Sequence, residues 1–286
     1  MRIALIRFMA ALSLVVSMSS MAARDFSNAE IKAANVAGDV YVLTGPGGNI
    51  GVLATDAGLL LVDDKFAPLA EKIEAAMQSI NKAELKYIIN THYHGDHTGS
   101  NGHFGKQAPI FAHENVRTRV KEDNKQADAD LPVVTYEQGI TIHLHNEEVK
   151  IVHFPHGHTD GDSIVYFKNT NVLHMGDLFF QGRFPYIDLD HGGSVKGYLA
   201  NVKKITESYP SDVVIIPGHG DITDLKGLQQ VVAMLEYSIE RVSSALAAGK
   251  SSEQILKDGI GEKYKDWSWG FINEERWLKT LIKDLG

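Results

Sequence analysis

The sequence predicts an α/β protein in which two stacked β-sheets are covered by helices on both outer faces. Runs of short strands are interrupted by single helical segments, and this arrangement occurs twice along the chain. Each sheet then has one face for the other sheet and one face for a helix layer. A chain of 286 residues is long enough to bury a full core of this kind.

The first half of the chain is predicted from alternating turn chemistry and apolar periodicity. Glycine-rich turns separate its first three strands, which predicts an antiparallel meander. A switch to helical spacing then precedes a β-branched and aromatic strand. The predicted elements are three strands, a helix, two further strands and a polar helix, at residues 40–43, 49–55, 58–62, 67–80, 85–90, 109–112 and 114–125.

The second half repeats the pattern more loosely. Two pairs of strands are expected to turn across Asn146-Glu147 and across residues 168–171. The predicted elements are four strands, a helix, a strand and a long amphipathic helix, at residues 140–145, 149–154, 163–167, 172–175, 195–208, 213–216 and 224–247. The tail beyond Ser251 carries four large aromatic residues and is expected to dock on the domain as a terminal helix, rather than to form a separate binding module: Trp267, Trp269, Phe271 and Trp277.

The charge balance is acidic, with 28 basic against 36 acidic residues and a formal net charge of −8. The absence of a basic patch argues against a nucleic-acid-binding protein. The chain has no cysteine, so disulfides cannot support it. We expect its core to hold it together without them.

The first 22 residues have the pattern of a cleavable signal peptide. Arg2 and Arg7 supply positive charge, residues 8–16 form an apolar run, and Ser20-Met21-Ala22 offers a cleavage site. The apolar run is too short to span a bilayer. We therefore expect a periplasmic or secreted protein without stable membrane insertion after cleavage, an uncleaved anchor being the alternative.

The residues most informative about function lie between Thr91 and Asn101. His92, His94, Asp96 and His97 fall within six positions, directly after the predicted strand at residues 85–90. Imidazole and carboxylate groups are the zinc ligands that remain when thiolates are absent. Alternate residues turn to the same side at a strand end, so His92 and His94 can hold one ion while Asp96 and His97 face a second.

The pattern His-x-His-x-Asp-His resembles that of the metallo-β-lactamase superfamily. The resemblance implies an αββα sandwich of two mixed β-sheets, with residues 23–286 as one hydrolase domain that includes the C-terminal helices. It also implies three further metal ligands, each at a predicted strand end: His158 in a Gly-His-Thr element, Asp177 as a carboxylate bridging both metals, and His219 as the last ligand of the second site.

The implied chemistry is hydrolysis by metal-bound hydroxide. Two zinc ions about 3.5 Å apart lower the pKa of a shared water and polarise a substrate carbonyl. Asp96 is the expected catalytic residue, because its carboxylate can hydrogen-bond the hydroxide as well as bind the second metal. Zinc is favoured weakly over iron or manganese. The expected partner is a small acyl compound with an activated or strained bond, such as a β-lactam, a lactone or an ester.

Asp177 keeps alternative functions open. The resemblance is to β-lactamases that bind the second zinc with Asp, His and His, yet those enzymes usually carry serine or another non-ligand at this position. A thioesterase similar to glyoxalase II fits Asp177 but does not fit export. A non-hydrolytic redox protein with two irons normally carries glutamate where this chain has His94, and it is fused to a flavodoxin domain.

Residues 179–193 form a long loop after Asp177, where specificity is often encoded. Arg183 is a candidate to pair a substrate carboxylate, with Phe184 and Tyr186 as apolar walls. Local packing of these three residues is the alternative. Asp63 is a candidate to support the metal-binding loop. The other histidines are expected to be structural, and no pattern specifies an oligomeric state.

Overall fold

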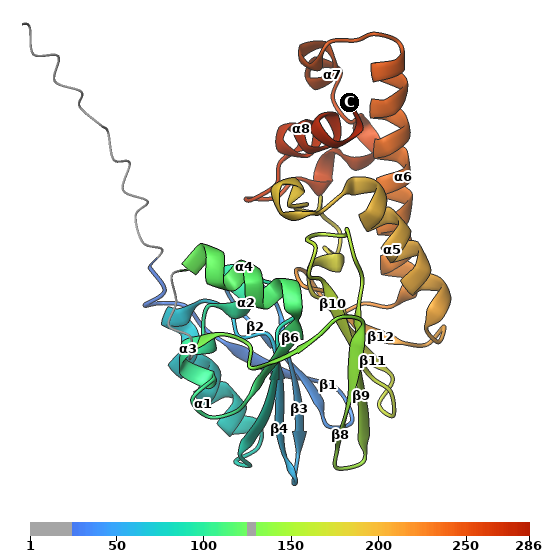
Figure 1. Ribbon diagram of the computed structural model, residues 1–286. Helices are drawn as coiled ribbons and strands as arrows, with labels where there is room; N and C mark the ends of the chain where they lie inside the picture. The colour runs from blue at the N-terminus through green and yellow to red at the C-terminus, as the bar shows by residue number, and fades with distance from the viewer. Residues whose placement is uncertain (1–24, 125–129) are drawn as a thin grey trace, which may run out of the picture.

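The computed structural model describes residues 25–124 and 130–286 as two stacked β-sheets between layers of helices (Figure 1). The larger sheet runs in the order β1 to β7, and the smaller in the order β12-β11-β10-β9-β8. Figure 1 shows α1 and α4 beside the larger sheet and α5 and α6 beside the smaller one. The predicted α/β sandwich is confirmed.

Both sheets are mixed. The larger sheet contains β1 (Lys32–Ala37), β2 (Val40–Thr44), β3 (Ile50–Thr55), β4 (Gly58–Val62), β5 (Leu85–Ile89), β6 (Ile110–His113) and β7 (Val134–Tyr136). The smaller contains β8 (Gly139–Leu144), β9 (Glu147–His153), β10 (Ser163–Phe167), β11 (Val172–His174) and β12 (Val214–Ile216). Neighbours from β1 to β4 are antiparallel, those from β4 to β7 are parallel, and β12 runs parallel to β11.

The helices are α1 (Ala70–Ile80), α2 (Gly95–Thr98), α3 (Asn101–Phe104), α4 (Glu114–Asn124), α5 (Val195–Ser208), α6 (Leu225–Ala247), α7 (Ser252–Asp258) and α8 (Glu274–Leu285). Short 3₁₀ turns add η1 (Ala67–Leu69), η3 (Gly176–Leu178), η4 (Leu189–His191) and η5 (Glu262–Trp267). The predicted helix at residues 67–80 thus begins as η1. Asp224 caps α6 by accepting hydrogen bonds from the Lys226 and Gly227 amides.

Strand alternation explains why the larger sheet is buried on both faces. Leu53, Leu60 and Val62 face the smaller sheet, where they meet residues such as Val149 and Ile151. The intervening side chains of the same strands pack toward α1 in a separate cluster. A strand buried on both sides reads as a continuous apolar run, as β3 and β4 do.

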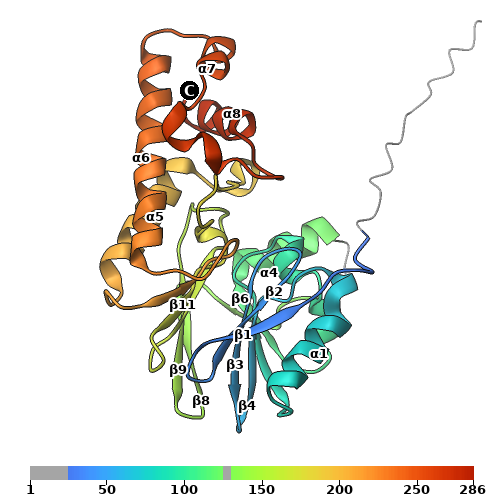
Figure 2. The ribbon, with the colours of Figure 1, turned by 180° about the vertical axis from the view of Figure 1, so that it is seen from behind.

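The C-terminal helices α7 and α8 pack with α6, beyond the end of the smaller sheet (Figure 2). Trp277 of α8 is fully buried, and its indole Nε1 donates to Ser238 Oγ of α6 at 3.2 Å. The terminal helix therefore docks its tryptophan on the body of the protein, as expected from the aromatic tail.

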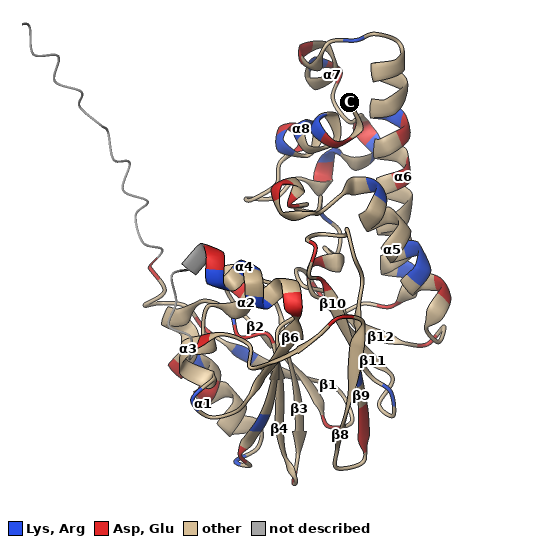
Figure 3. Cartoon of the chain, in the orientation of Figure 1, with Lys and Arg blue, Asp and Glu red and all other residues tan. Residues whose placement is uncertain are grey.

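The outer faces of the helices carry charges of both signs, as Figure 3 shows for α1, α6 and α8. Within the described residues, no helix is sufficiently long and apolar to cross a membrane. The predicted signal peptide, residues 1–22, lies outside the described residues and stays a prediction.

Candidate metal centre

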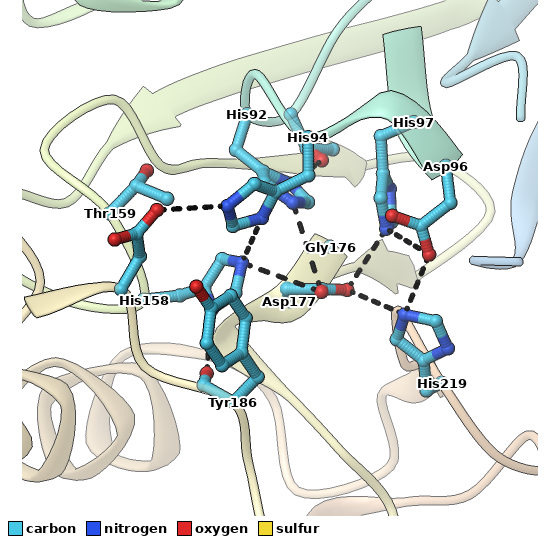
Figure 4. A network of polar contacts seen from close by, with 12 residues as sticks. His92, His94, Asp96, His97, His158, Thr159, Gly176, Asp177, Tyr186 and His219 are labelled. Carbon is cyan, nitrogen blue, oxygen red and sulfur yellow. Dashed lines mark hydrogen bonds and ion pairs between the residues drawn. The ribbon is translucent and has the colours of Figure 1, made fainter. Parts of the chain in front are cut away.

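The seven predicted ligand residues come together in one place, at the ends of four separate strands (Figure 4). The loop that follows β5 carries His92 and His94, and α2 carries Asp96 and His97. His158 lies in the turn between β9 and β10, Asp177 lies in η3 after β11, and His219 follows β12. The edge of the sandwich where these strands end therefore concentrates polar side chains that the sequence separates by more than a hundred residues.

These side chains form two groups, each small enough to surround one ion. One contains His92, His94, His158 and Asp177, and the other contains Asp96, His97 and His219. The candidate ligand atoms within each group lie within 4.8 Å of one another. His92 and His94 thus fall in one group and Asp96 and His97 in the other, as the sequence predicts. The role of these residues as metal ligands stays a prediction.

The Asp177 carboxylate lies between the two groups. Its Oδ2 is 3.7 Å from His92 Nε2 and 3.5 Å from His158 Nε2. Its Oδ1 is 3.1 Å from His97 Nε2 and 3.4 Å from His219 Nε2. Each carboxylate oxygen thus faces a different pair of histidines, which is the geometry required of a bridging ligand.

The second nitrogen of four imidazoles is held by a hydrogen bond, which fixes the nitrogen that faces the centre. His92 Nδ1 lies 3.1 Å from Thr91 Oγ1, and His158 Nδ1 lies 2.7 Å from the Tyr186 carbonyl. His94 has the opposite orientation. Its Nε2 contacts the Asp188 carboxylate away from the centre, while its Nδ1 lies 2.8 Å from His158 Nε2.

Asp63 supports the loop as the sequence suggested. Its carboxylate accepts hydrogen bonds from the Thr91 amide at 2.7 Å and the Thr91 hydroxyl at 2.8 Å, and it lies 2.7 Å from His97 Nδ1. The residue is fully buried and adopts a left-handed φ of 65°, which is uncommon for a residue other than glycine. Asp63, whose backbone is strained, thereby orients both the metal-binding loop at Thr91 and the His97 imidazole.

Asp188, which no sequence pattern marks as functional, orients His94. Its Oδ2 lies 3.1 Å from His94 Nε2 and 3.0 Å from His191 Nδ1, and it accepts a hydrogen bond from the Tyr93 hydroxyl. Tyr93 also contacts His191 Nδ1 at 2.9 Å. No local spacing marks Asp188, since it lies 94 residues after His94 in a long loop. Its only sequence signal is its place in the loop after Asp177.

The chemistry of the centre fits divalent metal ions. His92 Nε2 is buried without a hydrogen-bond partner, and His97 Nε2 and Asp177 Oδ1 lie 3.1 Å apart without the geometry of a hydrogen bond. Such burial is costly unless another ligand satisfies these atoms. Burial lowers the pKa of His158 to about 3 and that of His92 well below its usual value. Both imidazoles are therefore neutral at pH 7, the form that donates a lone pair to a metal.

A cleft of about 1050 Å³ opens above the two groups. Arg183 and Tyr186 line it, and their contact with a substrate stays a prediction. Phe184 does not, so its assignment as an apolar wall is wrong. Its ring is fully buried and stacks on Trp277 with centroids 5.9 Å apart, because its backbone is tied to the Trp267 carbonyl by a hydrogen bond of 2.9 Å.

The remaining histidines lie outside both groups, as expected of structural residues. His113 and His153, the last residues of β6 and β9, stack with ring centroids 3.7 Å apart. His103 lies 2.8 Å from a Glu74 oxygen. His156 is exposed.

The family model of the metallo-beta-lactamase superfamily matches residues 43–219. A beta-lactamase-like protein 2 homolog from Caenorhabditis elegans is 25% identical over 83% of this chain and 79% of its own. A hydroxyacylglutathione hydrolase from Prochlorococcus marinus is 30% identical over 66% of this chain and 65% of its own. The structure of a metallo-beta-lactamase from Pontibacter korlensis covers 72% of this chain and 99% of its own with a TM-score of 0.64, and its 19% identity shows a shared fold.

The matched region contains all seven residues of the two groups. Relatives named as hydrolases, including a probable metallo-hydrolase from Bacillus subtilis, support a metal-dependent hydrolase. The chain belongs to the metallo-beta-lactamase superfamily.

Proposed function

We propose that this protein is a dinuclear zinc hydrolase that opens an activated or strained acyl bond, in the range of β-lactams, lactones and esters. The observation that carries the proposal is the Asp177 carboxylate, which lies between two histidine-rich groups with one oxygen facing each. The cleft above these groups gives a small molecule access to them.

The two groups define which residues would hold each ion. His92, His94 and His158 would bind the first, Asp96, His97 and His219 the second, and Asp177 both. Two bound zinc ions would supply Lewis acidity for the substrate carbonyl and lower the pKa of water at the site.

Asp96 has the position and charge of a group that orients the attacking water. It lines the cleft, and its Oδ2 lies 3.3 Å from His219 Nε2. Burial acts to raise its pKa, but His97 and His219 outweigh that effect and hold it at about 2. The group is therefore a carboxylate at neutral pH, able to accept a hydrogen bond from water and to hold its proton.

The described lining of the cleft offers no serine, threonine or cysteine nucleophile to compete with water. Covalent catalysis by such a side chain therefore has no candidate at this site, which supports direct attack by water.

Arg183 is the candidate for binding a substrate carboxylate. It is the one lysine or arginine among the described residues lining the cleft. Its Nε donates to the Gln181 carbonyl at 3.3 Å, which leaves the terminal guanidinium nitrogens for a ligand. Tyr186 would contribute an apolar wall, since its ring lies 5.4 Å from that of His94.

A thioesterase is the second candidate function. Two relatives are named hydroxyacylglutathione hydrolase, from Prochlorococcus marinus and Pelagibacter ubique. The position of Asp177 is compatible with either activity. The choice between acyl substrates therefore depends on the walls of the cleft rather than on its metal ligands.

The test is a hydrolysis panel with zinc-loaded protein: a chromogenic cephalosporin, a carbapenem, an acyl-homoserine lactone, an aryl ester and a glutathione thioester. We expect turnover of one oxygen-ester, lactone or β-lactam class and its loss in His94→Ala and Asp177→Ala. Turnover of the thioester alone would favour the second candidate. A protein that binds two zinc ions but hydrolyses none of the panel would contradict the proposal.

We also infer that the mature protein is exported. The proposal rests on the signal-peptide pattern of residues 1–22. Fractionation of expressing cells followed by N-terminal sequencing should find a periplasmic or secreted chain that begins at Ala23. A cytoplasmic chain that retains Met1 would contradict it.

A further inference from the structure

We infer that the cleft selects substrates with an aromatic group beside the scissile acyl bond, and that Trp269 and Phe271 determine this specificity. The inference rests on the proposed hydrolytic function, because it concerns what the same cleft accepts. Both residues lie on the connection between η5 and α8, about fifty residues beyond the last candidate metal ligand.

Trp269 forms a wall directly beside the metal centre. Its ring centroid lies 5.6 Å from that of His219 and 6.0 Å from that of Phe180. Phe180 in turn stacks on His219 at 5.1 Å with an interplanar angle of 9°. An apolar group bonded directly to a carbonyl held at the metal centre would therefore contact the Trp269 ring.

The Trp269 ring is fixed before any ligand arrives. Its indole Nε1 donates to the Phe184 carbonyl at 2.9 Å, and its backbone amide donates to the Ile272 carbonyl at 3.0 Å. The Arg183 guanidinium lies 5.2 Å from the ring centroid. Because the indole N–H already has a hydrogen-bond partner, the ring offers the cleft an apolar surface. A ligand would lose little side-chain conformational entropy by binding there, since the ring is already ordered in the folded protein.

Phe271 extends this wall to the mouth of the cleft. Its side chain is 41% exposed and is one of three large hydrophobic residues exposed among those the structure describes. Its ring contacts Tyr186 at 5.4 Å and Trp269 at 5.8 Å, and Arg276 lies over it at 4.3 Å. An exposed aromatic ring held in place at a cleft mouth indicates a binding surface rather than a core position.

Two further aromatic side chains line the cleft. Phe26 and Phe66 line the cleft and stack on each other with centroids 5.2 Å apart. The cleft thus combines several aromatic rings with the polar side chains of the metal centre. Flat surfaces of this kind favour another ring, because offset and edge-to-face contacts add to the burial of apolar area.

The test measures binding of two hydroxamates, acetohydroxamic acid and 3-phenylpropanohydroxamic acid, to the zinc-loaded full chain by isothermal titration calorimetry. The two share a metal-chelating group and differ in the phenyl group. We expect the phenyl compound to bind about tenfold or more tightly to the wild type, from the area that its ring buries. In Trp269→Leu and Phe271→Ala the ratio of affinities should fall to within about threefold.

Trp267→Leu is the matched control. Trp267 belongs to the same aromatic tail but contacts Phe184 and Tyr264 instead of lining the cleft. This variant should keep the wild-type ratio. Phe271→Ala also guards against misfolding, because an exposed side chain contributes little to stability.

The outcomes separate this inference from the proposed function. If neither hydroxamate binds the wild type, the proposed two-metal centre is contradicted. If both hydroxamates bind the wild type equally, the aromatic selectivity is overturned while the metal centre is supported. The same holds if Trp269→Leu and Phe271→Ala keep the wild-type ratio of affinities.

Discussion

The floor and the walls of the cleft differ in how the chain encodes them. The floor comes from short motifs at the ends of β5, β11 and β12 and in the β9–β10 turn, where strand geometry fixes the direction of each side chain. The walls come from loops and from the C-terminal tail. The residues of the floor therefore determine the class of reaction. The residues of the walls can differ without changing the metal ligands, and so can determine the substrate.

The largest effect should come from the residue shared by both halves of the floor. Asp177→Ala removes the oxygens that face both pairs of histidines. We expect kcat/KM to fall on the order of 10³-fold or more, since several kcal/mol of transition-state stabilisation depend on the metals. Zinc content measured beside the kinetics should drop below that of the wild type. Retention of both zinc ions and most activity would refute a bridging role.

Substitution of two phenylalanines distinguishes a residue of the cleft wall from a residue of the core. Phe184→Ala should lower the free energy of unfolding by about 3–5 kcal/mol, because it leaves a cavity beside Trp277. Phe271→Ala should change it by less than about 0.5 kcal/mol. Urea unfolding of the metal-free proteins measures both. Equal losses would mean that Phe271 belongs to the core.

Substitution of Asp188 tests how far the floor of the cleft depends on the loop after Asp177, where no sequence pattern marks this residue. Asp188→Asn keeps the shape of the side chain but weakens the interaction with His94 Nε2. Activity or zinc affinity should fall by about 10–100-fold, the usual cost of losing a partner behind a metal-binding imidazole. Asp190→Asn is the control, because this nearby carboxylate pairs with Lys283. Similar losses in both variants would point to a general charge effect.

The pH dependence of zinc binding should give a smaller change. Burial acts to lower the pKa of His219, but Asp177 and Asp96 outweigh it and raise the pKa to about 9. In the metal-free protein His219 keeps its proton below that pH, and zinc must displace it. His97 must also lose a proton, since burial acts to lower its pKa but Asp177 and Asp63 outweigh that effect and raise the pKa well above the usual value. Apparent affinity should therefore rise at least about tenfold per pH unit from pH 7 to 8.5. Competition titrations against a chelator that show no change in this window would indicate an ordinary histidine pKa.

Much of the fold could be predicted because local patterns agree with tertiary structure. β4, β10 and α5 begin and end where periodicity and turns indicate. β1 could not be predicted, because its Lys-Ala-Ala-Asn run is exposed and has no apolar alternation. It is defined by backbone pairing with β2.

The candidate site shows the same limit. His92, His94, Asp96 and His97 could be grouped from spacing alone, but Phe184 could not be placed. Its ring packs against Trp277, which follows 93 residues later in the chain. Such contacts are set by how α8 docks, and no pattern near Phe184 records that.

The most direct test of the account is crystallographic. Anomalous diffraction from zinc-loaded crystals, collected above and below the zinc absorption edge, locates each ion without reference to activity. We predict two zinc peaks about 3.5–4 Å apart, one beside His92, His94 and His158 and one beside Asp96, His97 and His219, with Asp177 contacting both. A single peak, or two peaks that Asp177 does not join, would contradict the account.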